Sequence, residues 1–259
     1  MARNIRLLIA YDGNGYCGWQ RQSNAETIQG TLEKRLTIIA GEPISLQGAG
    51  RTDAGVHALG MAANFHTTSS SPVIAFQKGL NSLLPVDIRI LAAVEEKMEF
   101  HSRFDARGKR YRYDFFTGEV MLPTRRLYMA HIPCRFNLDL VQSCLNIITG
   151  THDFTSFEGA GSRDPGKTKG RGAVRTIYQA QCCSWQEEPD HWSLFLTGDG
   201  FLRHMVRNLA GTLFDVGRGK TTVNDFEIIL KTRDRRLAGQ NAPPCGLFLE
   251  KIYYDPVQS

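Results

Sequence analysis

Strand-like and helix-like segments alternate along the whole chain, and the second half repeats the order found in the first. The sequence lacks the long series of buried parallel strands that a doubly wound fold needs. The pattern therefore predicts an α+β protein of two similar halves, residues 1–108 and 109–259, with the boundary near residues 100–115. If these halves pack side by side, their sheets would line a shared cleft.

The spacing of apolar residues and the positions of glycine and proline predict the individual elements. Strands are expected at residues 5–11, 44–48, 61–67, 87–94, 109–116, 174–185, 191–197 and 247–254. Helices are expected at residues 27–39, 72–83, 138–149, 202–216 and 223–231. Residues 187–190, Glu-Glu-Pro-Asp, are the expected turn of a hairpin between two of the later strands.

Length, cysteine content and histidine spacing limit the class of protein. A chain of 259 residues can bury a core without disulfide bonds. Its six cysteines form no CxxC pair, which argues against a zinc ribbon or a thioredoxin-type site and suits a reducing cytosol. The histidines form no HxxxH or HExxH pattern, and no apolar stretch approaches the ~20 residues that cross a bilayer. We therefore expect a cytoplasmic protein with neither a metal nor a membrane segment.

The net charge is only +5, but the basic residues are clustered and most of them are arginine. Arginine binds phosphate through a planar fork of two hydrogen bonds, so several arginine clusters favour a long polyanionic partner over one small phosphate. Four groups stand out: Arg103, Arg107, Lys109, Arg110 and Arg112; Arg163, Lys167, Lys169, Arg171 and Arg175; Arg203, Arg207, Arg218 and Lys220; and Arg233, Arg235 and Arg236.

The segment most suited to chemistry is residues 48–58, where a short strand leads into a turn that holds Arg, Thr, Asp and His. Asp53 could simply cap this turn, as aspartate often does. However, the glycines of the segment allow its backbone to approach a ligand closely. Arg51 lies near enough in sequence to keep the Asp53 carboxylate ionised. Asp53 is therefore the main candidate for a catalytic group.

Residues 50–58, GRTDAGVHA, resemble the signature of the tRNA pseudouridine synthase A family. Further segments resemble parts of the same family and occur in the same order. They are YDGNGYCGWQRQ at 11–22, ARGKRYRY at 106–113, FLRHMVRNLAGTL at 201–213, VGRGK at 216–220 and APPCGLFLE at 242–250. The resemblance extends from about residue 5 to residue 254, which is nearly the whole chain.

The resemblance implies a fold of two RRM-like α+β halves around a basic central cleft, a homodimer, and the anticodon stem-loop of tRNA as substrate. Asp53 matches the family's catalytic aspartate, Tyr111 the tyrosine that stacks on the target uracil, and Arg203 an arginine that pairs with the aspartate. We also expect RNA contacts from four basic side chains near these positions, namely those of Arg51, Arg110, His204 and Arg207.

The implied reaction is an isomerisation, so it needs no redox cofactor and no nucleotide. A single carboxylate could act as a nucleophile at C1′ of the uridine or as a base at C2′, and the sequence leaves both open. Tyr111 also fits an ordinary aromatic residue of a strand. The i, i+4 spacing of Arg203 and Arg207 fits an exposed helix face, although the apolar residues around them place the helix against a core.

Two other functions are compatible with parts of the sequence. A non-catalytic RNA-binding protein with RRM-like halves would use the same basic clusters, Tyr111 and Tyr113, but it would have no need for Asp53. Residues 161–168 match the phosphate-loop pattern GxxxxGK[ST] of nucleotide hydrolases. Because a strand rather than a helix is expected to follow them, we interpret residues 159–172 as a surface loop or an arm that contacts RNA phosphates.

Overall fold

The structure is a computed structural model that describes residues 1–159 and 172–257. The phosphate-loop pattern at 161–168 thus lies outside the described residues. The chain forms two compact units. The first contains Met1–Arg107 and Phe248–Pro256, and the second contains Gly108–Leu247 and Val257. Both units combine helices with a sheet, which confirms the predicted α+β class.

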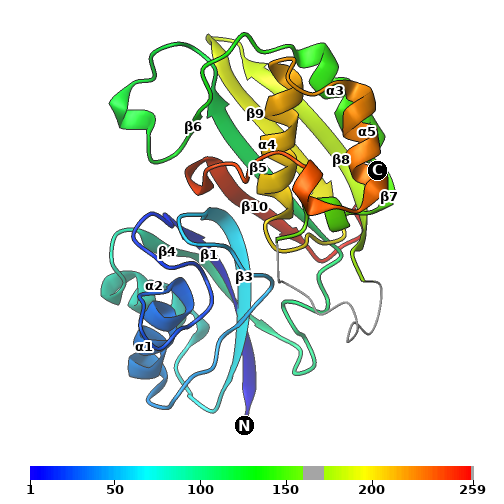
Figure 1. Cartoon of the computed structure of the whole chain (residues 1–259). Helices are drawn as coiled ribbons and strands as arrows, with labels where there is room; N and C mark the ends of the chain where they lie inside the picture. Colours follow the sequence, from blue (N-terminus) through cyan, green and yellow to red (C-terminus); the bar gives the residue numbers. More distant parts are fainter. Residues whose placement is uncertain (160–171, 258–259) are drawn as a thin grey trace. The chain divides into compact units, whose positions relative to one another are not determined.

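The first unit contains a sheet in which β1 (Arg3–Tyr11) lies between β4 (Ile88–Glu96) and β3 (His57–Thr67) and is antiparallel to both. The short strand β2 (Gln47–Gly48) pairs with β3. On its other side, β3 pairs in parallel with β10 (Leu247–Tyr253) through Phe248 and Leu249 (Figure 1). The last strand of the chain therefore completes the sheet of the first unit.

Two helices, α1 (Ile28–Ala40) and α2 (Val73–Leu83), lie side by side against one face of this sheet (Figure 1). Alternate residues of β1 point toward them, so that Ile5, Leu7 and Ile9 are completely buried. The side chain of Thr27 caps α1 by accepting a hydrogen bond from the Gly30 N–H. The first unit thus provides a rigid base for the loops at the ends of its strands.

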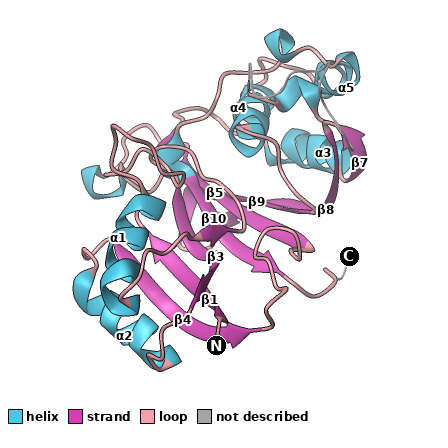
Figure 2. Cartoon of the chain, turned by 90° about the horizontal axis from the view of Figure 1, so that it is seen from below, coloured by secondary structure: helices cyan, strands magenta, loops and turns pink. Residues whose placement is uncertain are grey.

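The second unit has an antiparallel sheet in the order β5 (Gly108–Phe116), β9 (Glu188–Gly198), β8 (Val174–Trp185) and β7 (Gly150–Asp153). β6 (Ala130–His131) pairs in parallel with β5. Three helices gather on one face of this sheet (Figure 2). They are α3 (Leu138–Ile148), α4 (Met205–Gly217) and α5 (Val223–Thr232). The described chain also has 3₁₀ turns at Pro123–Arg125, Thr155–Phe157, Arg235–Leu237 and Pro244–Gly246.

The start of α4 differs from the prediction. The helix was expected from residue 202, but it begins at Met205, and His204 before it has a left-handed backbone with φ of 60°. Arg203 therefore precedes the helix, and the i, i+4 relationship to Arg207 does not apply. The error arose because Leu202 continues the apolar spacing of α4, although the left-handed backbone of His204 lies between Leu202 and the helix.

The hairpin turn also differs from the prediction. Trp185 pairs directly with Glu188, so the turn consists of residues 186–187, and the Glu188-Pro189-Asp190 segment belongs to β9. Pro189 is compatible with a strand because it lies near the strand end, where fewer ladder hydrogen bonds are needed. The expected strand at 44–48 is likewise reduced to the two residues of β2.

Among the helices of the described residues, none has both the length and the apolar composition needed to cross a membrane.

Candidate active site

The Asp53 loop, residues 49–56, joins β2 to β3 in the first unit. Asp53 is half-buried and Arg51 is exposed. The carbonyl of Asp53 accepts a hydrogen bond from the Val56 N–H at 3.1 Å, which closes a tight turn. Gly55 within this turn has φ of 75°, a left-handed conformation that favours glycine. The local sequence thus presents the Asp53 side chain on a sharply folded loop.

A second loop, residues 12–19, follows β1 and packs closely against the Asp53 loop. A Cβ atom on Gly13 would lie 2.1 Å from the Val56 carbonyl oxygen, and one on Gly18 would lie 2.6 Å from that of Thr52. Both distances are too short for a side chain, so this packing requires glycine at both positions. The glycines near the start of the sequence therefore serve the contact between the two loops.

Hydrogen bonds join the two loops. The Trp19 N–H donates to the Thr52 carbonyl at 3.0 Å, and the Gly55 N–H donates to the Tyr16 carbonyl at 3.4 Å. At the end of β1, the hydroxyls of Tyr11 and Thr52 are 2.8 Å apart. The residue before Asp53 is thus held through both its side chain and its main chain.

His57 supports the far side of the same loop. Its side chain is buried and stacks on Phe248 of β10, with 4.7 Å between the ring centroids. Its Nδ1 accepts a hydrogen bond from the Gly13 N–H at 3.1 Å. Asp12 Oδ1 also lies 3.2 Å from this nitrogen. Nδ1 accepts the Gly13 proton only in the form that carries no hydrogen on this nitrogen, and in that form it does not donate to Asp12. Within the described residues, no group of three or more His, Cys, Asp and Glu side chains could bind a metal.

Tyr111 lies on β5 in the second unit and is buried. Its ring meets the edge of Phe201 at a centroid distance of 5.0 Å and an angle of 82°. Because side chains alternate along a strand, Arg110 points to the opposite face of the sheet. There its guanidinium lies 4.7 Å from the centre of the Phe195 ring, within cation–π distance. Phe201 was not singled out in the sequence, although it stands two residues before Arg203.

Arg203 and His204 occupy the turn that leads into α4. The Arg203 side chain is exposed, and its carbonyl accepts a hydrogen bond from the Gly159 N–H at 2.8 Å. A Cβ atom on Gly159 would lie 2.9 Å from Nδ1 of His204. The left-handed backbone of His204 therefore places Arg203 in a fixed turn rather than on a helix face.

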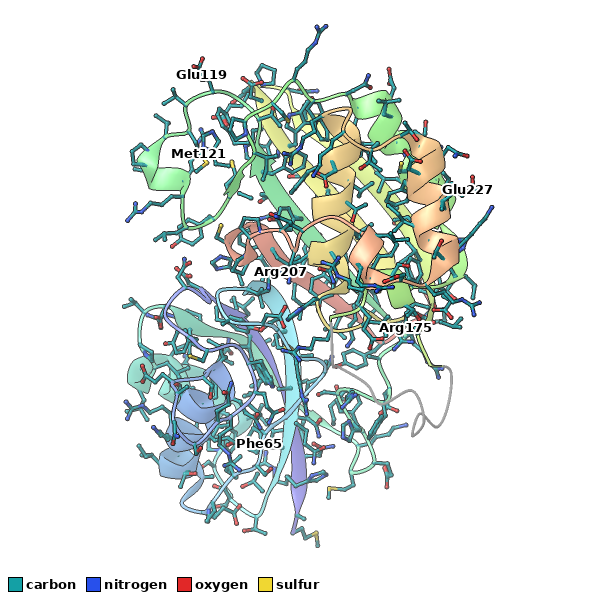
Figure 3. The ribbon with its side chains drawn as sticks, in the orientation of Figure 1. Phe65, Glu119, Met121, Arg175, Arg207 and Glu227 are labelled. Atoms are coloured by element: carbon teal, nitrogen blue, oxygen red, sulfur yellow. The ribbon has the colours of Figure 1, made fainter. Side chains whose placement is uncertain are left out.

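Arg207, labelled in Figure 3, is the one residue of α4 that is not buried. Its Nε donates to the Ala242 carbonyl at 2.7 Å, and the Ala242 N–H donates to the Arg207 carbonyl at 3.1 Å. The Tyr113 hydroxyl donates to the neighbouring carbonyl of Pro243 at 2.7 Å. Arg207 thus fixes the segment that leads into β10, a role that the sequence did not indicate.

The predicted site residues fall into two groups. Arg51 and Asp53 belong to the first unit, whereas the second unit contains the remaining five candidates. These are Arg110, Tyr111, Arg203, His204 and Arg207.

Comparison with known proteins shows what this chain is related to. A family model described as tRNA pseudouridine synthase matches residues 7–105 and 146–255. The chain belongs to this family. The match includes the Asp53 loop, the 12–19 loop and the segment from Phe201 to Arg207, whereas Arg110 and Tyr111 lie between the two matched stretches.

Three relatives in this synthase family are similar over nearly their whole length. The tRNA pseudouridine synthase A 1 of Desulfotalea psychrophila is 52% identical over 97% of this chain and 100% of the relative. The tRNA pseudouridine synthase A of Geobacter sp. strain M21 is 44% identical over 97% of this chain and 99% of the relative. That of Acetivibrio thermocellus is 40% identical over 97% of this chain and 100% of the relative.

The chain is therefore a tRNA pseudouridine synthase, which is an isomerase. This confirms the function that the motifs indicated. The family assignment also decides against a non-catalytic RNA-binding protein and against a nucleotide hydrolase.

Proposed function

We propose that this synthase converts uridine to pseudouridine in the anticodon stem-loop of tRNA, with Asp53 as the catalytic carboxylate. The observation that carries the proposal is the Asp53 loop itself. A half-exposed aspartate follows a residue fixed by hydrogen bonds through Tyr11 and Trp19, within a stretch that matches the family model. Such a preorganised carboxylate is what a reaction with one essential acidic group needs.

The chemistry accounts for the choice of a carboxylate. The reaction breaks the bond from C1′ to N1 of uracil, turns the base, forms a bond from C1′ to C5, and moves the C5 hydrogen to nitrogen. Substrate and product are isomers, so no electrons are gained or lost. Asp53 would act as a nucleophile at C1′ or as a base at C2′, and both routes need the ionised form.

Tyr111 and Arg203 are proposed to assist Asp53. The Tyr111 ring is oriented by its edge contact with Phe201, and an aromatic face can hold a base that has left its stack. Arg203 has an exposed side chain on a fixed turn and would supply the cationic partner of the aspartate in the active complex. The pairing of Arg203 with Asp53 rests on the family resemblance.

We also propose that the two units are RRM-like halves whose sheets line a basic central cleft that receives the tRNA. Arg51, Arg110, His204 and Arg207 are its proposed RNA contacts, and Arg51 is the most exposed of them. The Nε of Arg207 donates to the Ala242 carbonyl, so this nitrogen is not part of the proposed phosphate contact. A cytoplasmic location follows from the proposed substrate.

A homodimer is proposed as the active form. The segment around Pro123–Arg125, which includes Met121 in Figure 3, carries several exposed apolar side chains. Val120 is 80% exposed and Leu122 is 58% exposed. Exposed apolar side chains that gather in one place mark surfaces for protein association. Light scattering of the purified protein checks this, with a dimer expected and a monomer at micromolar concentration contradicting it.

The test of the function is to map pseudouridine in an unmodified tRNA transcript after incubation with the pure protein in EDTA, without nucleotide. Pseudouridine confined to the anticodon arm is expected. Modification elsewhere would contradict the proposed substrate region. Activity that is lost on chelation and restored by a metal would contradict the cofactor-independent mechanism.

A further inference from the structure

We propose that Tyr11 is a positioning residue for the isomerisation and acts on Asp53 through the hydroxyl of Thr52; this rests on the proposed catalytic role of Asp53. The two hydroxyl oxygens are 2.8 Å apart. Only 4% of Tyr11 and 7% of Thr52 is exposed, so water has little access to this hydrogen bond. In such a place, a hydroxyl pair fixes geometry more firmly than it would at the surface.

Tyr11 is suited to this role because it belongs to a rigid element. It is the last residue of β1, where it pairs with Ala58 of β3 on one side and Ile88 of β4 on the other. Its ring also packs against Trp19 at a centroid distance of 6.1 Å. The Tyr11 side chain is thus held by a strand with a neighbour on each side, and its hydroxyl reaches the Asp53 loop.

Thr52 transmits this fixed position to Asp53. Its side chain is held by Tyr11, and its carbonyl accepts the Trp19 N–H at 3.0 Å. That carbonyl belongs to the planar peptide that joins Thr52 to Asp53, so its orientation defines one side of Asp53. The other side is defined by the hydrogen bond from the Val56 N–H to the Asp53 carbonyl. Hydrogen bonds therefore hold the main chain on both sides of Asp53.

A small displacement of a catalytic group is costly. A shift of about 1 Å can slow a reaction by about 10²-fold, even when binding is unchanged. Removing the Tyr11 hydroxyl takes away the hydrogen bond to the Thr52 hydroxyl and so loosens one of the two supports of the peptide before Asp53. We therefore expect the change to reduce the rate of chemistry without affecting tRNA affinity.

The experiment measures the single-turnover rate, tRNA affinity and melting temperature of a set of variants. Tyr11→Phe removes one hydroxyl and Thr52→Val removes the other. The double variant removes both, and Thr52→Ser keeps the hydroxyl but not the methyl group. Tyr254→Phe is the matched control, because it removes a hydrogen bond to the Ser102 carbonyl in the same unit that touches neither loop. Asp53→Asn shows whether the carboxylate itself is needed.

We expect Tyr11→Phe and Thr52→Val each to lower the single-turnover rate by about 10-fold or more at unchanged affinity, by the distance dependence of catalysis. The double variant should be no slower than the slower single variant, because both changes break the same bond. Thr52→Ser should restore most of the rate. Tyr254→Phe should lower the melting temperature to a similar extent but leave the rate unchanged.

The proposal is overturned if Tyr11→Phe reacts as fast as Tyr254→Phe, or if the effects of Tyr11→Phe and Thr52→Val multiply in the double variant. Should Thr52→Val fail to fold, the comparison of Tyr11→Phe with Tyr254→Phe is still decisive. The catalytic role of Asp53 and the positioning role of Tyr11 can fail separately. An inactive Asp53→Asn with a fully active Tyr11→Phe removes only the positioning role, whereas an active Asp53→Asn removes the catalytic role.

Discussion

Gly13 lies directly against the main chain of Val56, so that a Cβ atom on Gly13 would be only 2.1 Å from the Val56 carbonyl oxygen. This contact joins the end of β1 to the Asp53 loop. Because the obstacle is backbone rather than a flexible side chain, the loops would have to move apart to accept even a methyl group.

Gly13→Ala is therefore expected to displace the Asp53 loop and to destabilise the first unit by about 1–3 kcal/mol, the usual cost of overpacking. The single-turnover rate should fall well below that of the unchanged protein. Gly15→Ala is the matched control, because no heavy atom lies within 4 Å of the position of its added Cβ. Equal stability and equal rates for the two variants would show that the loops are not tightly joined.

Arg207 provides a test between a structural role and a contact with RNA. Arg207→Met keeps much of the apolar stem but removes the donor to the Ala242 carbonyl, which costs about 1–3 kcal/mol when the acceptor is left unsatisfied. We expect lower stability in denaturant titration and a small loss of affinity. A large loss of tRNA affinity at unchanged stability would instead identify Arg207 mainly as a phosphate contact.

Tyr111 is expected to hold the uracil through its ring. Tyr111→Phe should keep most of the base binding but can slow turnover where the hydroxyl takes part in proton transfer. Tyr111→Ala should lose the stacking energy, about 1–3 kcal/mol per base. Because the ring is buried against Phe201, the alanine variant also creates a cavity, so both must be assayed below their melting temperatures. Equal activity of the alanine variant and the unchanged protein would remove Tyr111 from the site.

Arg203 and Lys231 should respond in opposite ways. Arg203→Lys keeps the charge but loses the planar fork, so the single-turnover rate should fall more than the tRNA affinity. Lys231→Ala changes an exposed lysine of α5 that pairs with Glu227 at 2.5 Å, and it should cause at most a small loss of affinity. Both must be measured at one salt concentration. If Arg203→Lys changed only affinity, Arg203 would be an ordinary phosphate contact.

Most helices and strands could be predicted from the sequence, because the apolar spacing of each one is visible within a short stretch of residues. The helix expected at 27–39 is found at Ile28–Ala40, with Thr27 as its cap, and the strand expected at 109–116 is found at Gly108–Phe116. The start of α4 was wrong because apolar spacing does not reveal the left-handed backbone of His204. Apolar spacing indicates which side chains are buried, but it does not show where a residue leaves the helical conformation.

The details of the candidate site could be predicted only in part. Asp53 was identified from its glycine-rich loop and its motif. The interactions that hold the Asp53 loop were not identified. The hydrogen bond between Tyr11 and Thr52 and the contact between Gly13 and Val56 join residues about 40 positions apart. The stacking of Phe248 on His57 could not be predicted either, because the sequence does not show that the last strand pairs with β3.

The catalytic role of Asp53 is tested most directly by the single-turnover formation of pseudouridine by Asp53→Asn, measured together with its affinity for tRNA. Asparagine keeps the size of the side chain but can act neither as a nucleophile at C1′ nor as a base at C2′. We expect normal tRNA affinity, which rests on many basic contacts, and a rate at least about 10²-fold lower. Pseudouridine formation by Asp53→Asn at a rate close to that of the unchanged protein would show that the Asp53 carboxylate is not the catalytic group.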